Sequence, residues 1–255
     1  MLFKIIWFYL AFCFTLNWGV EGAEIKVVYN NIPGSPRFES AWGLSYLIRG
    51  GKWNILFDTG GDPDLLTRNL KRAAVGPEEI NAVVLSHYHQ DHCGGLEAVL
   101  KPHLPVFLPY SFPPGFKRGL RNRGIQVVDV KEPVRIAPGV WSTGVLEGHI
   151  PEQSLLVKTA SGLVVITGCS HPGVENICLR AHSLFPGNIY LVTGGFHLGA
   201  ASPEKVSRII KELKVLKVEK VAPNHCTGSM AIRMFKEAWG DNFIHLGVGE
   251  TCRID

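Results

Sequence analysis

One stretch of ten residues decides the fold: Ser86-His87-Tyr88-His89-Gln90-Asp91-His92-Cys93-Gly94-Gly95. It follows Asn81–Leu85, an apolar run that predicts a strand. Three imidazoles and a carboxylate this close together form a poor core, whereas as metal ligands they supply four donors at little chain-closure cost. Alternate side chains of an extended segment point the same way, so His87, His89 and Asp91 can converge while His92 faces a neighbouring point. The spacing therefore indicates two ions, with one pair of donors for each.

Three later loops each place a histidine just past the carboxyl end of a predicted strand, where open α/β sheets collect their ligands. These loops are Gly168-Cys169-Ser170-His171, Gly194-Gly195-Phe196-His197 and Pro223-Asn224-His225-Cys226-Thr227-Gly228. Any one of them alone fits a structural histidine better than a ligand. Their recurrence in a chain with the first cluster favours a shared site. His149 is a further candidate, at the start of a strand, and we assign no role to His103, His182 or His245.

Short apolar runs interleave with helical patterns along the rest of the chain, without a linker or an internal repeat. This predicts one α/β (α+β) domain built either from two layers of sheet with helices outside or from one sheet covered on both faces. Helices are expected at 64–73, 95–100, 173–184, 203–216 and 229–239. Strands are expected at 25–29, 44–48, 53–57, 81–85, 106–108, 126–130, 140–143, 154–159, 163–167, 188–193, 220–222 and 243–246.

The first 22 residues have the form of a secretory signal. Lys4 precedes Ile5–Leu16, an unbroken apolar run of twelve residues. An uncleaved anchor would need about 20 apolar residues, and Asn17 interrupts the run before that. We expect cleavage between Gly22 and Ala23, a mature domain over 23–255, a periplasmic or secreted location and no stable membrane anchor after cleavage.

Composition excludes several classes of protein. With 46% hydrophobic and 19% charged residues in 255, the chain is neither disordered nor a coiled coil. Its formal net charge is +4, and no run of basic residues offers a stripe for nucleic acid. Loss of Cys13 with the signal leaves five of the six cysteines, so at least one thiol stays unpaired within the chain.

These motifs carry a resemblance to a known family. The turn Leu56-Phe57-Asp58-Thr59-Gly60, the 87–92 cluster and the later strand-end histidines resemble the metallo-β-lactamase superfamily. Within it, Glu152-Gln153-Ser154-Leu155 and the three later loops resemble a branch named for a dihydropterin–aminobenzene ribofuranosyl phosphate synthase. The match runs from about Val27 to Gly249. The resemblance implies a four-layer αββα sandwich with metals at one edge between the sheets.

The resemblance also implies roles for individual residues. His87 and His89 would hold the first of two divalent ions, and Asp91, His92 and His225 the second. The third ligand of the first ion would be His171, as in the branch, or His149, as in most of the superfamily. Cys169 falls where most members carry a bridging aspartate, close enough for a thiolate ligand. Asp58 would orient a ligand imidazole, and the ions would be zinc, with manganese or iron as alternatives.

A two-metal site of this kind indicates hydrolysis of a small ester, lactone, amide or phosphodiester by a metal-held hydroxide. Asp91 would accept the proton of the water, and His197 would face the leaving group. Synthase chemistry is an alternative, although a signal peptide conflicts with precursors expected in the cytoplasm, and a non-catalytic metal-binding protein is another. The segment Pro109–Arg123 is a candidate to face an anionic substrate through Lys117, Arg118, Arg121 and Arg123, or else a solvated cationic face. Substrate and oligomeric state stay open.

Overall fold

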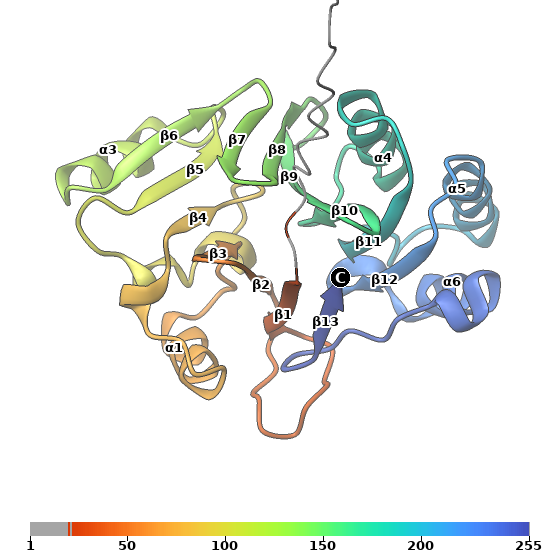
Figure 1. Cartoon of the computed structure of the whole chain (residues 1–255), viewed down its shortest axis with the longest axis horizontal. Coiled ribbons are helices and arrows are strands. Elements are labelled where there is room, and N and C mark those ends of the chain that lie inside the picture. The colour runs from red at the N-terminus through yellow and green to blue at the C-terminus, as the bar shows by residue number, and fades with distance from the viewer. Residues whose placement is uncertain (1–19, 21, 255) are drawn as a thin grey trace, which may run out of the picture.

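The strands form two sheets that lie face to face. The computed structural model of the chain describes residue 20 and residues 22–254. Strands β13-β1-β2-β3-β4-β5-β6 form one sheet and β12-β11-β10-β9-β8-β7 the other (Figure 1). The strands span β1 Ala23–Asn30, β2 Leu44–Gly50, β3 Trp53–Phe57, β4 Ala82–Val84, β5 Pro105–Pro109, β6 Gln126–Val130, β7 Val134–Ala137, β8 Val140–Leu146, β9 Glu152–Thr159, β10 Gly162–Thr167, β11 Ile189–Gly195, β12 Lys220–Asn224 and β13 Thr251–Ile254.

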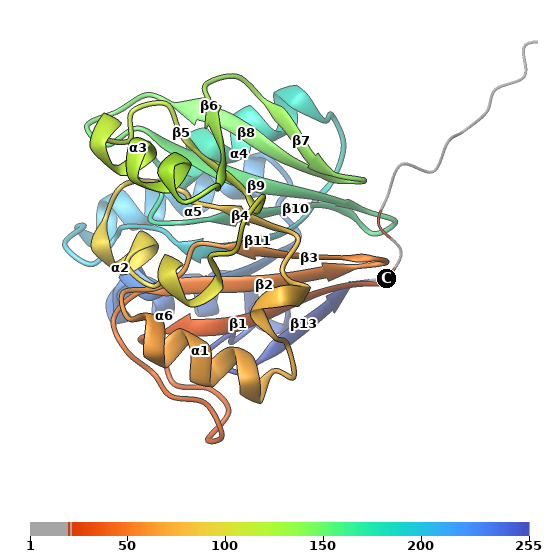
Figure 2. The same cartoon turned by 90° about the vertical axis from the view of Figure 1, so that its left-hand side faces the viewer.

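Helices cover the outer face of each sheet. In Figures 1 and 2, α1 and α3 lie outside the first sheet, and α4, α5 and α6 lie outside the second. The helices span α1 Pro63–Arg72, α2 Gln90–Cys93, α3 Pro114–Asn122, α4 Val174–Leu184, α5 Pro203–Val215 and α6 Ser229–Trp239, and short 3-10 turns occur at Pro77–Glu79, Leu96–Val99, His225–Thr227 and Gly240–Asn242. This confirms the predicted four-layer αββα sandwich.

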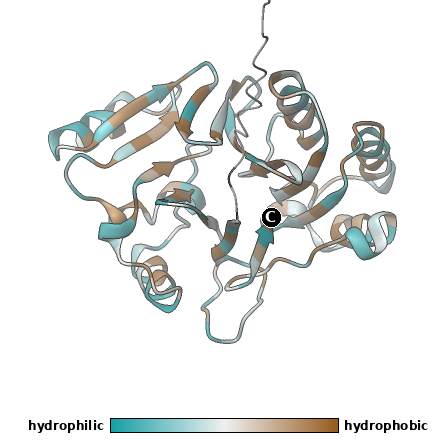
Figure 3. Ribbon diagram, viewed as in Figure 1, coloured by the Kyte–Doolittle hydropathy of each residue, from teal (hydrophilic) through white to brown (hydrophobic). Residues whose placement is uncertain are grey.

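Three apolar clusters separate the four layers. The cluster between the sheets contains Tyr46, Phe57 and Leu155, all fully buried. A second cluster packs α1 and α3 on the first sheet, and a third packs α4, α5 and α6 on the other. Brown hydrophobic residues accordingly alternate with teal ones along the elements in Figure 3. Burial on both faces explains why the central strands read as continuous apolar runs.

The polar loops leave the sheets at corresponding ends. In the first sheet β3 and β4 are parallel neighbours, and in the second β10, β11 and β12 are. Parallel neighbours end at the same edge of a sheet, so the loops after these five strands gather at one edge of the sandwich. These are the loops in which the sequence places Asp58, His87–His92, Cys169–His171, His197 and His225.

Some predicted elements differ in the structure. Residues 243–246 form no strand, and only an isolated bridge joins Phe243 to Val221. Strands β7 and β13 and helix α3 lacked a clear pattern, because they are short and, in α3, Pro114, Gly115 and Gly119 weaken the helical signal. The extended geometry expected for the first cluster is not kept, because β4 ends at Val84, residues 87 and 88 form a bend, and α2 begins at Gln90 and carries Asp91 and His92 on its first turn.

The predicted signal lies almost entirely outside the described residues. Val20, which is described, is buried, and its amide donates to the carbonyl of Lys158 at 2.8 Å. Ala23 begins β1. Among the described helices, none combines the length and apolar character needed to cross a membrane.

Candidate metal centre

One carboxylate organises the first cluster. Asp58 follows β3 with a positive φ of 58° and is completely buried. Its Oδ1 accepts from the Ser86 amide, and its Oδ2 accepts from the Ser86 hydroxyl and from Nδ1 of His92, each at 2.7 Å. The predicted supporting role of Asp58 toward a ligand imidazole therefore has a geometric basis, since the carboxylate fixes both the start of the loop and one ring.

Three imidazoles each have Nδ1 held by an oxygen. His92 Nδ1 donates to Asp58, His87 Nδ1 lies 2.9 Å from the Ser86 hydroxyl, and His225 Nδ1 lies 2.8 Å from Oδ1 of Asn31. An Nδ1–H that donates to oxygen leaves Nε2 as the unprotonated nitrogen, which is the form that binds a metal. These contacts therefore prepare three Nε2 atoms as ligands.

One set of donors comes from both halves of the molecule. Asp91 and His92 lie on α2, and His225 follows β12. Nε2 of His92 is 3.2 Å from Nε2 of His225, and Oδ2 of Asp91 is 3.3 Å and 3.7 Å from the nitrogens of His225 and His92. Ligands of a tetrahedral zinc site are about 3.3 to 3.8 Å apart, given bonds of about 2.0 to 2.3 Å. These three residues therefore fit one ion.

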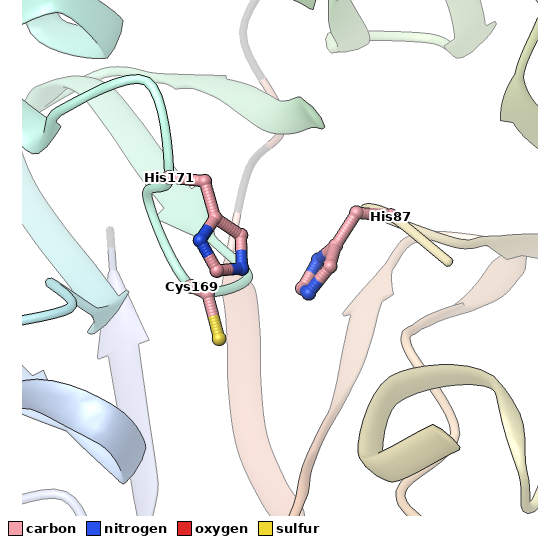
Figure 4. Close-up of side chains that lie close together, drawn as sticks. All are labelled: His87, Cys169 and His171. Atoms are coloured by element: carbon pink, nitrogen blue, oxygen red, sulfur yellow. The ribbon is translucent and has the colours of Figure 1, made fainter. Parts of the chain in front are cut away.

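A second set lies beside the first and also draws on both halves of the molecule, with the rings of His87 and His92 4.3 Å apart. His87 Nε2 lies 3.0 Å from His89 Nδ1, and His171 comes from the loop after β10 on the opposite side (Figure 4). Nε2 of His171 is buried and has no hydrogen-bond partner among the described residues, and its ring lies 4.8 Å from that of His87 and 5.1 Å from that of His89. A buried nitrogen without a partner, beside two other imidazoles, fits a metal ligand. His149, in contrast, is exposed and belongs to none of the three-donor groups among the described residues.

The Glu152 side chain fixes the loop that carries His171. This fully buried carboxylate accepts hydrogen bonds from the amides of Cys169, Ser170 and His171 at 2.8 to 3.0 Å. Burial raises its pKa to about 7, although the amides oppose that shift. Gly168 allows the loop to approach the first half, since a Cβ there would lie 2.2 Å from the Ser86 hydroxyl.

Burial and charge set the protonation of the donors in the metal-free chain. Burial lowers the pKa of His171 to about 4 and that of His87 well below its usual value, so both rings stay neutral. Burial also opposes the charge on His92, but the Asp58 carboxylate outweighs it and raises the pKa of His92 to about 9. Asp91 stays ionised because His225 and His92 lower its pKa against the effect of burial.

His197 lies at the open side of this cluster. Its ring is exposed and tilted against that of His171, with centroids 4.4 Å apart. A cavity of about 520 Å³ begins there, lined by His197, Trp42, Ser202, Lys205, Cys226 and residues 199–201. Trp42 is 60% exposed, and its ring is 5.0 Å from the ring of His225. The cavity therefore lies beside the donors, since its lining residues Trp42 and His197 contact the rings of His225 and His171.

The cationic segment before β6 is largely neutralised by its own neighbours. Lys117 and Arg121 both pair with Asp129, and Arg123 pairs with Glu97. The segment forms helix α3, and only Arg118 of its four cations lacks an ion pair among the described residues. The arrangement favours a solvated, internally paired face over a site for an anionic substrate.

Sequence reasoning missed three residues that shape the site. Asn31 and Trp42 lie in the loop between β1 and β2, which carries no motif, so nothing in the sequence marked them. Glu152 was noticed only as part of a resemblance. An acidic residue three positions before the apolar run Leu155–Val157 of a buried strand was the signal that could have identified its role.

Known proteins with similar sequences cover most of the chain. The 7,8-dihydropterin-6-methyl-4-(β-D-ribofuranosyl)-aminobenzene-5'-phosphate synthase of Methanocaldococcus jannaschii is 31% identical over 268 residues, with 85% of this chain and 91% of that protein aligned. A second, uncharacterised protein of the same organism is 28% identical, with 90% of this chain and all of that protein aligned.

Solved structures show the same architecture. A metal-dependent hydrolase of the β-lactamase superfamily, Tm1679, superposes with a TM-score of 0.76 at 28% identity, over 91% of this chain and 99% of that one. The metallo-β-lactamase fold protein YhfI of Bacillus subtilis, at 16% identity and a TM-score of 0.65, shares the fold. The model of the metallo-β-lactamase superfamily matches residues 43–225. The predicted family is thus confirmed, and the chain belongs to the metallo-β-lactamase superfamily.

Proposed function

We propose that the protein is a two-metal hydrolase of a small ester, lactone, amide or phosphodiester. The observation that carries this proposal is the pair of adjoining donor sets, His87/His89/His171 and Asp91/His92/His225, beside a cavity open to solvent. Structural zinc sites are closed, whereas catalytic sites keep access for water and substrate. When bound, the two divalent ions would supply Lewis acidity and an activated water.

Two side chains of the chain itself would move protons. Asp91 is an ionised carboxylate with a side chain 22% exposed, so it can accept a proton from a water molecule beside it. His197 is exposed, and its hydrogen bond to Cys226 raises its pKa, which stabilises the protonated form of the ring. We therefore assign the general base to Asp91 and the proton donor for the leaving group to His197.

The cavity at His197 has the size and chemistry of a small-molecule site. Its volume lies within the range of about 300 to 1,000 Å³ that such sites occupy. Trp42 offers a flat apolar face, and Lys205, on the first turn of α5, offers a cation. A substrate that rested on Trp42 would have its reactive group over His225 and His197. The size and lining of this cavity support a small molecule as the substrate.

A substrate screen with metal control tests the hydrolase. Purified chain is assayed with chromogenic esters, lactones and phosphodiesters, then treated with chelator and reloaded with Zn²⁺, Mn²⁺ or Fe²⁺. We expect hydrolysis that is lost with the chelator and regained with one of these ions. Bound metal without turnover on any class would favour a non-catalytic metal-binding protein instead.

Replacement of His197 separates catalysis from metal binding. The variant His197→Ala is expected to lower turnover by about 10²- to 10⁴-fold, the usual contribution of a general acid, while its metal content stays that of the parent. His182→Ala, at an exposed position on α4, is the matched control and should leave both unchanged. Loss of metal in His197→Ala would make this residue a ligand.

A synthase is the second candidate, and the sequence similarity to the Methanocaldococcus jannaschii protein favours it. Such an enzyme would join a dihydropterin to a ribofuranosyl-aminobenzene phosphate by a carbon–nitrogen bond. Incubation with a dihydropterin pyrophosphate and the aminobenzene phosphate, followed by mass spectrometry, separates the two candidates. A coupled product without ester or phosphodiester hydrolysis would support the synthase.

We further propose that the protein is exported after cleavage between Gly22 and Ala23. Support comes from the sequence, where a basic start, a twelve-residue apolar run and small residues near the cleavage site follow one another. Expression of the full chain in a bacterial host, cell fractionation and mass spectrometry of the N-terminus test it. The expected product begins at Ala23 and lies outside the cytoplasm, whereas an intact chain in the cytoplasm would contradict export.

A further inference from the structure

Cys169 occupies a position that no other donor shares. Its Sγ lies within 4.8 Å of the ligand atoms of His87 and His171, and within the same distance of those of His92 and His225. It is 3.2 Å from Nε2 of His92. We infer that Cys169 supplies one thiolate to both metal ions, an inference that rests on the proposed two-metal centre.

The backbone holds this sulfur where the two donor sets meet. Cys169 follows β10 directly, and its amide donates to Oε1 of Glu152 at 2.9 Å. The side chain is only 4% exposed, so its sulfur is withdrawn from solvent, and Figure 4 shows Cys169 on the same loop as His171, with His87 on the opposite side.

A shared thiolate gives the site a different preference for metals from a shared carboxylate. Thiolates favour zinc, cobalt and iron, whereas carboxylates suit magnesium and manganese. A thiol must lose its proton to bind a metal, so each Cys169 thiol that bound the ions would release its proton to solvent, with no oxidant or reductant involved.

Cys226 is the natural control for this assignment. It lies close to Cys169, with its Sγ 3.7 Å from the Cys169 carbonyl oxygen, and it also borders the cavity. Yet it shares a three-donor group only with Cys169 and His197, and with no histidine of the two sets. The two neighbouring thiols are thus predicted to differ in one property, because Cys169 binds the ions and Cys226 does not.

Cobalt spectroscopy tests the inference without reference to activity. The full chain is loaded with Co²⁺, and the sulfur-to-cobalt charge-transfer absorption in the near ultraviolet is recorded for the parent, Cys169→Ser, Cys169→Asp and Cys226→Ser. We expect the band in the parent and in Cys226→Ser, and its loss in both Cys169 variants. Cys169→Asp should keep two ions per chain and shift the preference from Zn²⁺ toward Mn²⁺.

X-ray absorption of the zinc protein keeps the test decisive if a Cys169 variant does not fold. In Cys226→Ser, both zinc ions should show a sulfur neighbour at about 2.3 Å. Zinc with no sulfur neighbour in that variant, or a cobalt band that survives in Cys169→Ser, would overturn the inference while leaving the two-metal enzyme intact. A parent chain that binds neither metal would overturn both proposals.

Discussion

At the scale of single residues, the oxygen atoms that hydrogen-bond the imidazoles matter as much to the geometry of the site as the imidazoles themselves. Asp58, Ser86 and Asn31 each hold Nδ1 of one candidate ligand. A ring that is free to rotate or to change tautomer would lose the orientation that a metal needs, so these contacts preorganise the centre. Their replacement should weaken metal binding although none of them is a ligand.

Asp58→Asn tests this preorganisation. The variant keeps the size of the side chain but removes the charge that holds His92 and Ser86, so the affinity of the Asp91/His92/His225 set should fall about 10- to 100-fold. Competition with a chromophoric chelator measures the change. Asp241→Asn, on an exposed 3-10 turn, should have no effect, and an unchanged affinity in Asp58→Asn would refute the supporting role.

The protonation of His92 predicts a pH dependence. Its pKa of about 9 in the metal-free chain means that the ring is an imidazolium at neutral pH, while a metal requires the neutral ring. Metal binding should therefore release a proton from His92, and apparent affinity should rise with pH up to about 9. Calorimetry in buffers of different ionisation enthalpy measures the protons released. Equal heats in all buffers at pH 7.5 would contradict this.

The same shift acts on stability with the opposite sign. A histidine whose pKa is raised in the folded chain stabilises the fold, and this contribution is complete at pH values below the usual histidine pKa of about 6.5. That contribution is lost as pH rises through about 9. Denaturant unfolding of the metal-free chain should thus show lower stability at pH 9 than at pH 6.5, and the difference should shrink in Asp58→Asn.

At the scale of elements, the strand ends position the centre. The alternation of apolar runs and helical patterns predicted most strands and the four longer helices α1, α4, α5 and α6, because buried strands and amphipathic helices leave strong periodic patterns. Short edge strands and α3 escaped, since few residues and several glycines and prolines leave weak patterns. Candidate ligands within motifs could be predicted, whereas the position of His171 near the other donors and of His149 away from them depends on how two loops pack in space, which spacing along the chain does not encode.

The loop between β10 and α4 provides a test at this scale. Glu152→Gln removes one acceptor oxygen and its charge, so amides of the 169–171 loop lose a buried partner. We expect a loss of about 2 to 3 kcal/mol in the free energy of unfolding of the metal-free chain, in line with charged hydrogen bonds left unmade. Denaturant titration measures it, with the exposed Glu147→Gln as control. A loss in the free energy of unfolding smaller than that of the control would show that the loop keeps its conformation without Glu152.

At the scale of the whole molecule, polar contacts cross the layer between the sheets. The hydroxyl of Tyr46 on β2 lies 2.9 Å from the Thr193 hydroxyl on β11 and accepts from the Asn224 amide on β12 at 2.6 Å. Because Thr193 donates to the carbonyl of Ala222, the Tyr46 hydroxyl donates to Thr193. This buried network links the two halves just below the metal centre.

Tyr46→Phe should weaken that link. The variant fills the same space but leaves the Asn224 amide with fewer partners, at a cost of about 1 to 3 kcal/mol. Chemical unfolding monitored by fluorescence measures the change, and Tyr88→Phe, at a half-exposed position, serves as the control. A stability equal to that of the control would show that the apolar layer alone joins the sheets.

The derivation of ligands from both sheets has a further consequence. One half contributes His87, His89, Asp91 and His92, and the other contributes Cys169, His171 and His225. Each ion would therefore bind residues of both halves and hold them together. Without metal, the two half-sandwiches would be joined at this edge by side-chain packing and by hydrogen bonds such as that between His225 and Asn31. Newly made chains that have not yet bound metal would be cleaved most readily by proteases. The amount of intact protein would therefore depend on the supply of metal.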